Sequence, residues 1–500
     1  MRMTPLATKQ SSPPASTDNI AAIAGRGTIY ITAAKIWFMI SGYGIAVTLA
    51  ALLTDENYGI YRVVISTVSI INAVIVTGTY QTVSKYVSQE PEKADSIKWK
   101  ALGLQVYVGG AVTLGFVVLA PVVASMLNDP RLSGWLRLAS LITLSYSFYS
   151  VYTGYFNGKK RFDIQAGLDI TYSTLKLAFI VLLAWLGFGV TGSVGGFALA
   201  AAVVLFISAT LARGGSRKGE ARAGQLFSFQ SYVLVFTFVL TLLQRVDLML
   251  IKALSSSNPT TASENAGYYS AAMDVANLTY QIVVSVTFVI FPLVSQSTFA
   301  DDLARTQGYI SKTLRYTLMI MALTATLFSS CASGVLRVIY RETYQAGSPA
   351  LRIVAFGMLF FGVLYVLTTI ISASGHPKVS LLLGVITLGL SAALNWLLIP
   401  VQGLAGAATA TTVSMLTGTL LACAYLWRRF RALTSITSLA RISGCAAVVY
   451  AASLLFSPAS KLLIIAELIC LSVVYLIALI ASGELGRHDL RLIERVFQRA

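Results

Sequence analysis

The chain has 500 residues, of which 56% are hydrophobic and only 11% are charged, and its mean hydropathy is +0.74. Soluble domains carry roughly 25% charged residues, so this composition excludes a soluble protein and indicates that most of the exterior faces lipid. The net charge of +17 fits basic cytoplasmic loops of a membrane protein better than nucleic-acid binding, and we expect no nucleic-acid partner.

Apolar runs long enough to cross a bilayer as helices recur along the whole sequence. Their continuity excludes the short alternating strands of a transmembrane β-barrel. We therefore predict an all-α polytopic membrane protein with about 14 transmembrane helices in the lipid bilayer, after a disordered cytoplasmic tail at 1–26. The predicted spans are 27–53, 58–84, 101–127, 134–156, 166–187, 190–212, 226–253, 266–297, 313–334, 350–374, 379–399, 403–427, 438–456 and 462–482.

Lysine and arginine in the predicted loops set the orientation. With the N-terminus inside, the cytoplasmic segments hold 26 of these residues against 7 on the opposite side. This bias predicts that both termini are cytoplasmic.

Signals of catalysis are weak. The longest predicted loops, 298–312 and 335–349, collect no convergent carboxylates, and the sequence contains no nucleotide-binding P-loop. The histidines, His376 and His488, fall in a turn and in the tail, and the four cysteines lie inside apolar runs without metal-ligand spacing. We expect no enzyme activity, no catalytic residue, no metal site and no cofactor.

Two halves of the chain resemble each other. Residues 56–61 (ENYGIY) and 264–269 (ENAGYY) open the second and eighth spans at an offset of 208. Residues 157–160 after span four correspond to 374–377 after span ten, and the GVTG at 189–192 corresponds to GLAG at 403–406. The shift is an even number of spans, so both copies insert the same way up, as in transporters built from parallel repeats.

The duplication predicts two six-helix lobes plus two C-terminal helices, with the substrate site between the lobes. The predicted units are an N-lobe at 27–212, a basic cytoplasmic linker at 213–225, a C-lobe at 226–427, two further spans at 428–482 and a basic cytoplasmic tail at 483–500.

Ionisable groups at membrane depth mark cavities or paired sites, because burying them in lipid is costly. Span eight carries Asp274, Asn277 and Gln281 on one helical face, and span two carries Arg62 on the corresponding face. The other candidates in the membrane are Lys35, Asp169, Tyr172, Lys176, Arg245 and Asp247.

Structural explanations remain open for several of these residues. Lys35 lies close enough to the cytoplasmic end to snorkel, and Lys176 lies two turns from Asp169 on one helical face and would pair with it if both side chains stretched. Arg245 and Asp247 could simply tie span seven to a neighbour. The alternative is a cavity in which Lys35, Arg62, Lys176 and Arg245 hold an anionic group such as a diphosphate, with tyrosines such as Tyr172 and Tyr280 stacking on sugar rings.

Four segments resemble a known family. They are residues 53–61 (LTDENYGIY), 154–162 (GYFNGKKRF), 245–247 (RVD) followed by 266–272 (AGYYSAA), and the Phe291–Pro292 pair that ends span eight. In order and spacing they resemble the multidrug/oligosaccharidyl-lipid/polysaccharide (MOP) exporter superfamily, in particular the Wzx-type oligosaccharide flippases. The resemblance covers roughly residues 25 to 482.

The resemblance implies a V-shaped fold similar to that of multidrug (MATE) transporters, located in the bacterial inner membrane. It also implies that a polyprenyl-diphosphate-linked oligosaccharide moves from the cytoplasmic to the outer leaflet by alternating access, for O-antigen, capsule or exopolysaccharide synthesis, alongside polymerase or export proteins. Two alternatives stay open: a lipid II flippase, and a drug antiporter coupled to protons or sodium through acids such as Asp247 or Asp274. Which ion gradient, if any, drives transport is not readable from the sequence.

Overall fold

The computed structural model describes residues 17–214, 237–456, 458 and 460–486. Within these ranges the chain is helical and contains no β-strand, which confirms the predicted all-α class. The helices are α1 (Thr17–Leu52), α2 (Asp55–Gln89), α3 (Ala94–Met126), α4 (Leu132–Gly158), α5 (Phe162–Leu183), α6 (Gly189–Leu211), α8 (Val246–Leu254), α9 (Pro259–Phe299), α10 (Leu303–Ser330), α11 (Ala332–Ile339), α12 (Ser348–Ala373), α13 (Pro377–Phe430), α14 (Ile436–Ser453) and α15 (Lys461–Ala481).

Eight helical stretches in the described ranges are long and apolar enough to cross a membrane, or nine if α10 and α11 are one bent span. Two of them, 162–211 and 377–430, each hold two of the spans expected from the sequence. The molecule is therefore a polytopic membrane protein, and the figure of about 14 spans stays a prediction.

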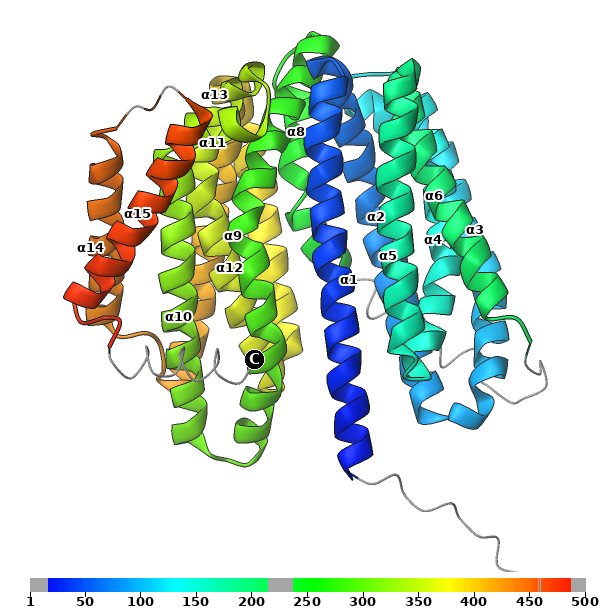
Figure 1. Cartoon of the computed structure of the whole chain (residues 1–500), viewed down its shortest axis with the longest axis horizontal. Helices are drawn as coiled ribbons and strands as arrows, with labels where there is room; N and C mark the ends of the chain where they lie inside the picture. Colours follow the sequence, from blue (N-terminus) through cyan, green and yellow to red (C-terminus); the bar gives the residue numbers. More distant parts are fainter. Residues whose placement is uncertain (1–16, 215–236, 457, 459, 487–500) are drawn as a thin grey trace, which may run out of the picture.

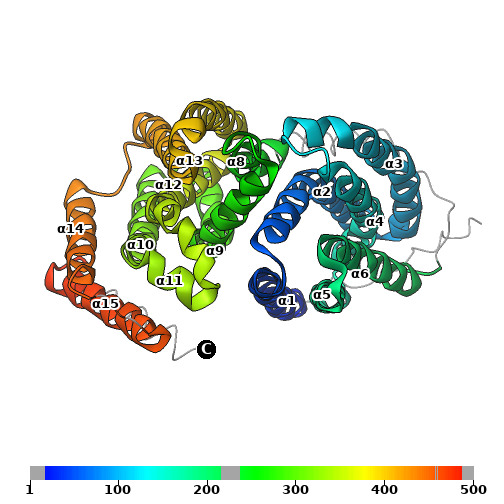
Figure 2. The same cartoon turned by 90° about the horizontal axis from the view of Figure 1, so that it is seen from above.

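The helices form two lobes side by side (Figure 1). Helices α1 to α6 pack together in one lobe, and α8 to α13 pack together in the other. Helices α14 and α15 pack on α10 and α11, on the side of the second lobe that faces away from the first (Figure 2). This arrangement agrees with two repeated lobes followed by an appended helix pair.

The backbone supports the proposed duplication at a sharp turn in each lobe. Gly189 begins α6 with φ 55° and ψ −133°, and Gly403 interrupts α13 with φ 57° and ψ −130°. Glycine adopts this conformation without steric cost because it has no Cβ. The corresponding glycines of the GVTG and GLAG motifs thus make the same turn.

Another proposed equivalence needs correction. In the turn that follows α4, the helix of span four, Lys160 has φ 59°, and in the turn that follows α12, the helix of span ten, Gly375 has φ 90°. Both residues hold the left-handed position that closes a helix C-terminus. Lys160 therefore corresponds to Gly375, whereas the sequence motifs had aligned Gly158 with it.

Several predicted boundaries also differ. Helix α1 begins at Thr17, inside the segment assigned to a disordered tail. The predicted loop 298–312 shortens to residues 300–302, and the predicted loop 335–349 holds part of α11 and a 3₁₀ helix, Glu342–Gly347. Most of the predicted linker 213–225 and of the tail 483–500 lies outside the described residues.

Two predicted spans are not straight. The span at 226–253 is helical over 237–243, turns at Gln244 and Arg245, and resumes as α8; its first part lies outside the described residues. The span at 313–334 ends in a bend of 84° between α10 and α11. Helix α11 then runs across the end of the lobe instead of continuing through it.

The lobes meet where α2 crosses α9, near the start of both helices. A Cβ atom on Gly59 would lie 1.7 Å from the carbonyl oxygen of Ser263, and one on Gly267 would lie 3.2 Å from the carbonyl oxygen of Asp55. The two backbones can come this close only because neither glycine has a side chain. Gly59 and Gly267 are the corresponding glycines of the two repeats.

Charged side chains surround this crossing. They lie at the end of the molecule that holds the α1–α2 turn at residues 53 and 54, which we call the distal end. Arg341 of the second lobe donates to Asp55 over 2.7 Å and to the carbonyl oxygen of Leu53 over 2.8 Å, and Thr260 donates to Glu56 over 2.9 Å. These contacts join the lobes at the distal end.

The most deeply buried of these contacts joins Lys252 of α8 to Asp129, in the turn between α3 and α4. Their atoms lie 2.9 Å apart, and the two side chains are 0% and 1% exposed. Burial alone would raise the pKa of Asp129, but hydrogen bonds from Arg131 and Lys252 outweigh it and hold the pKa below its usual value. The carboxylate therefore stays ionised at neutral pH.

We expect Gly59→Ala to destabilise the protein, because the added Cβ would overlap the Ser263 carbonyl and push α9 away from α2. Overpacking of this kind costs about 1–3 kcal/mol. Thermal unfolding of the purified protein should show a lower midpoint. Gly110→Ala is the matched control, since a Cβ there meets nothing within 4 Å; equal midpoints for the two variants would contradict the close crossing.

We expect Asp129→Asn to cost about 3–5 kcal/mol, because it leaves the Lys252 ammonium buried without its counter-charge. The folded-state pKa of Asp129 lies below the unfolded value of 3.8, so this stabilisation is complete above that value and is lost only at more acid pH. The difference in thermal stability between parent and variant should thus be present at about pH 5 and shrink as the pH falls below about 4. Asp163→Asn, at the exposed pair with Arg161, should change stability by at most about 1 kcal/mol.

Candidate functional site

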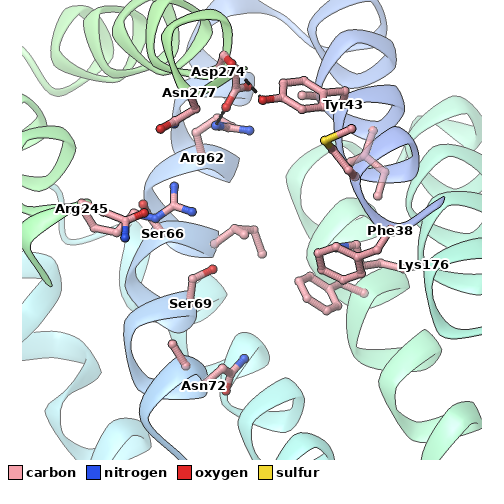
Figure 3. A pocket seen from close by; sticks show the side chains of 18 of the residues that line it. Phe38, Tyr43, Arg62, Ser66, Ser69, Asn72, Lys176, Arg245, Asp274 and Asn277 are labelled. Carbon is pink, nitrogen blue, oxygen red and sulfur yellow. Dashed lines mark hydrogen bonds and ion pairs between the residues drawn. The ribbon is translucent and has the colours of Figure 1, made fainter. Parts of the chain in front are cut away.

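A cavity of about 620 Å³ lies between the lobes (Figure 3). Its wall is built mainly from α1 and α2 of the first lobe and α9 of the second, with one residue each from α4, α5 and α6 and two from the turn at 244–245. The cavity begins beside the α2–α9 crossing and follows α2 from Tyr61 to Thr77, a length of about 24 Å. It therefore extends deep into the membrane-spanning part of the molecule.

The long polar side of the cavity follows from helical spacing. Arg62, Ser66, Ser69 and Asn72 succeed one another along a single face of α2, and Figure 3 shows them in that order along the helix. Across from them, Asp274, Asn277 and Gln281 of α9 also line the wall. The polar faces of these two related helices thus turn toward the same space.

Arg62 and Asp274 join the lobes at the distal limit of the cavity. The Arg62 Nη2 lies 2.5 Å from the Asp274 Oδ1, and the Arg62 Nε donates to the Ser270 hydroxyl. Asp274 also accepts a hydrogen bond from the Tyr340 hydroxyl at 3.3 Å, and its backbone oxygen accepts one from Tyr43 at 3.1 Å. A paired cation and anion therefore separate the cavity from the distal end.

Lys176 reaches the cavity through aromatic side chains. Its Nζ lies 5.1 Å from the ring centre of Phe38, 5.6 Å from that of Tyr172 and 4.9 Å from that of Phe197. Cation–π contacts stabilise a buried ammonium without neutralising its charge. Within the described ranges, Lys176 has no ion pair with a carboxylate.

The suggested pair between Lys176 and Asp169 is absent. The Tyr149 hydroxyl donates to Asp169 over 3.1 Å, and Asp169 interacts electrostatically with Lys35. Asp169 lies outside the cavity wall and forms no ion pair with Lys176. The charge of Lys176 therefore stays available to a ligand.

Arg245 lies in the turn before α8, where the helical backbone is interrupted. Its side chain lines the cavity near Ser66 (Figure 3) and has no ion pair among the residues that the structure describes. The nearby carboxylate of Asp247 turns away and accepts hydrogen bonds from Tyr269 at 2.7 Å, Thr411 at 3.3 Å and the Leu248 amide at 2.7 Å. Asp247 thus makes the hydrogen bonds that tie span seven to its neighbours, whereas Arg245 interacts with Asp247 and Asp274 electrostatically without a salt bridge.

Most of the residues singled out from the sequence come together. The cavity wall contains Lys35, Arg62, Lys176, Arg245, Asp274, Asn277 and Gln281. Three lie behind it: Tyr172, whose hydroxyl bonds to that of Tyr146, Asp169, and the buried Asp247. Of the two tyrosines expected to stack on sugar rings, Tyr280 lines the cavity and Tyr172 does not.

Other wall residues were missed by sequence reasoning. Tyr43, Phe38, Tyr146 and Phe197 are aromatic residues inside apolar helices, where side chains facing lipid and side chains facing a cavity look alike. Asn72 was detectable, because it continues the polar face of Arg62, Ser66 and Ser69 by one more turn.

The wall has a clear excess of positive charge. Among the residues that line it there are four cations, Lys35, Arg62, Lys176 and Arg245, and a single acid, Asp274. Cations at this depth are expensive unless a counter-charge or water accompanies them. The cavity is therefore suited to an anionic group.

Two helical lobes around a central cavity are also the fold of solved transporters of the MOP superfamily. Among solved structures, the lipid II flippase MurJ in its inward closed conformation matches with a TM-score of 0.77 and 15% identity, over 92% of this chain and 100% of that one. An inward-facing MATE multidrug transporter matches with a TM-score of 0.61 and 14% identity, over 79% and 94%. A MOP transporter of Pyrococcus furiosus matches with a TM-score of 0.60 and 13% identity, over 82% and 95%.

The chain belongs to the family of polysaccharide biosynthesis proteins, whose model matches residues 48–349, more than half of its length. An uncharacterized membrane protein of Methanocaldococcus jannaschii is 26% identical over 187 residues, which are 37% of this chain. That match spans only 36% of the relative's own length. The family match confirms the resemblance seen in the sequence, and the fold matches that of solved flippases and multidrug transporters.

Proposed function

We propose that this transporter is a flippase for a polyprenyl-diphosphate-linked oligosaccharide. The lipid-linked sugar enters from the cytoplasmic leaflet and leaves to the outer leaflet as the two lobes rock about the cavity. The protein resides in the bacterial inner membrane with both termini in the cytoplasm, and its product feeds the synthesis of an exported polysaccharide by polymerase and export proteins.

The observation that carries this proposal is that two cations of the cavity, Lys176 and Arg245, form no salt bridge within the described residues. Both side chains line the cavity, and within the described part of the chain neither forms a salt bridge with a carboxylate, although Arg245 interacts electrostatically with Asp247 and Asp274. Arginine and lysine bind phosphate oxygens through charge-assisted hydrogen bonds. A diphosphate would supply the counter-charge that these residues lack.

The size of the cavity supports binding of a head group rather than of a whole lipid. A volume of about 620 Å³ is in the range of sites for small ligands, roughly 300–1,000 Å³. It accommodates a diphosphate and the first sugars, with Tyr280 at the wall as a stacking surface. The polyprenyl chain then stays in the bilayer.

The positive-inside bias of the loops makes the distal end the outer face. The α2–α9 crossing and the surrounding ion pairs close that end. In this assignment the structure represents a state closed toward the outside, from which the lobes separate at the distal end to release the ligand.

The charge of the wall argues against an exporter of cationic drugs. Its one acid, Asp274, is already paired with Arg62, and the other charges at the wall are positive. Lipid II remains the second candidate, because it is also a polyprenyl-diphosphate glycan and the fold matches that of a lipid II flippase. The two candidates differ in the glycan and share the diphosphate.

An ion gradient is the energy source that we expect, with no bound cofactor. Asp247 is the candidate for proton or sodium coupling, because its buried carboxylate accepts hydrogen bonds from neutral donors only, Tyr269, Thr411 and a backbone amide. Collapsing the proton gradient and the sodium gradient separately would identify the ion.

Lys176→Met and Arg245→Gln each remove one positive charge from the cavity at similar side-chain volume. We expect each to slow flipping of a fluorescent polyprenyl-diphosphate oligosaccharide in proteoliposomes by roughly tenfold or more, because a hydrogen bond to a charged group is lost. Lys312→Met is the matched control, since it removes an exposed cation of α10 away from the cavity.

Flipping at the parent rate by both cavity variants would contradict the proposal. The same vesicles loaded with lipid II distinguish the second candidate, because a peptidoglycan flippase should prefer lipid II over an oligosaccharide carrier. Efflux of a cationic dye, with a block in Asp274→Asn, would instead indicate a drug antiporter.

A further inference from the structure

Asp274 is an acid in a wall that is otherwise suited to anions. Among the residues lining the cavity, it is the single carboxylate beside four cations, and its side chain and that of Arg62 are only 15% and 17% exposed. An acid in such a place weakens binding of an anionic ligand, because like charges repel strongly where water is scarce. Its presence there needs a reason.

The contacts of Asp274 tie it to both lobes. The residue belongs to α9, while the guanidinium that it holds belongs to α2, and Tyr43, which donates to its backbone oxygen, belongs to α1. Its second carboxylate oxygen accepts from Tyr340, just after α11. Asp274 therefore connects one lobe with the other through its side chain and its backbone.

The Arg62–Asp274 pair is the contact between the lobes that a ligand meets first. Both residues line the cavity, whereas the Gly59–Gly267 crossing and the Asp55–Arg341 pair lie beyond them toward the distal end. A ligand in the cavity thus has direct access to the Arg62 guanidinium, and to no other of these contacts.

Arg62 cannot serve Asp274 and a ligand equally well. Its Nε is bonded to Ser270 and its Nη2 to Asp274, so a phosphate that binds the same edge of the guanidinium in bidentate fashion has to displace these partners. A group with a single negative charge offers Arg62 no more than the carboxylate already does. A diphosphate offers more charge and more acceptor oxygens, and it is also drawn by the unpaired Lys176 and Arg245.

We propose that Asp274 is a specificity-determining residue that competes with the ligand for Arg62, so that a diphosphate displaces it and thereby breaks the ion pair between the lobes. This proposal rests on the proposed function, because it takes the ligand to be a diphosphate. Weakly charged ligands leave the pair intact and the distal end closed. Transport is thus started by the chemical group that distinguishes the lipid carrier.

The test measures binding and distal opening separately in the full chain, with inorganic diphosphate as the probe. Spin labels at Gly134→Cys on α4 and Glu342→Cys near α11 report the distal distance after the four native cysteines are replaced by serine; both positions are exposed. In the parent, diphosphate should bind by calorimetry and lengthen this distance. Acetate at the same concentration should leave the distance unchanged.

Removing the competitor should have two effects. Asp274→Asn should bind diphosphate about tenfold more tightly than the parent, and it should show the long distance without any ligand. Tyr340→Phe keeps the carboxylate but removes one of its donors, and it should shift affinity in the same direction by a few-fold. Glu467→Gln is the matched control, since it neutralises a carboxylate of α15 outside the cavity and should leave both readings at the parent values.

The outcomes separate this proposal from the function on which it rests. Diphosphate binding with parent affinity in both Asp274→Asn and Tyr340→Phe overturns the competition. If the parent binds diphosphate but the distance between the spin labels does not increase, the proposed separation of the lobes is wrong. Neither of these two results contradicts the proposed flippase function. A parent that binds no diphosphate at all overturns the proposed function together with this inference.

Discussion

The close approach of α2 and α9 is the contact on which the rest of the structure depends. Gly59 and Gly267 bring the two backbones together, and three residues further along each helix Arg62 bonds to Ser270. In both cases the partners are 208 positions apart, which is the offset of the repeat. A two-fold relation between the lobes makes corresponding faces meet at its axis, as in an isologous dimer interface.

That symmetry explains why the cavity is polar on two sides and closed at one end. Each repeat contributes the same helix face, so the polar residues of α2 and α9 turn toward one space. Small residues stand where the helices touch, and longer polar residues stand where they diverge. The departure from symmetry is chemical: the position corresponding to Ser66 in the first repeat is Asp274 in the second, and this acid can reach Arg62.

Hydropathy and the repeat made much of this predictable. The apolar runs give the helices because a buried backbone must satisfy its own hydrogen bonds, and the paired glycine motifs give the equivalent turns at Gly189 and Gly403. The sequence also identifies the polar faces of α2 and α9. The sequence does not reveal where the two-fold axis between the lobes lies. The contact between Arg62 and Asp274 therefore became visible only in the structure.

The direction of some helices and the partners of some membrane-embedded side chains were harder to predict. The 84° bend between α10 and α11 falls at Cys331, with no proline to mark it in the sequence. Helical spacing alone made Asp169 a partner for Lys176, yet Tyr149 holds that acid and aromatic rings hold the lysine. Such choices depend on neighbouring helices that spacing along one helix cannot reveal.

The distribution of neutralised and unneutralised cations separates structural sites from the ligand site. Lys252 is as deeply buried as any side chain in the described ranges, and it has Asp129, a hydroxyl and a carbonyl oxygen as partners. Lys176 is surrounded by rings, which stabilise its charge and leave it available. An unpaired charge at membrane depth costs at least a few kcal/mol. Selection for stability alone would therefore favour an acidic partner for Lys176 as well as for Lys252. In the function that we propose, this cost is tolerated because an anionic ligand supplies the missing partner at the cavity, and Arg62 holds its acid only until that ligand arrives.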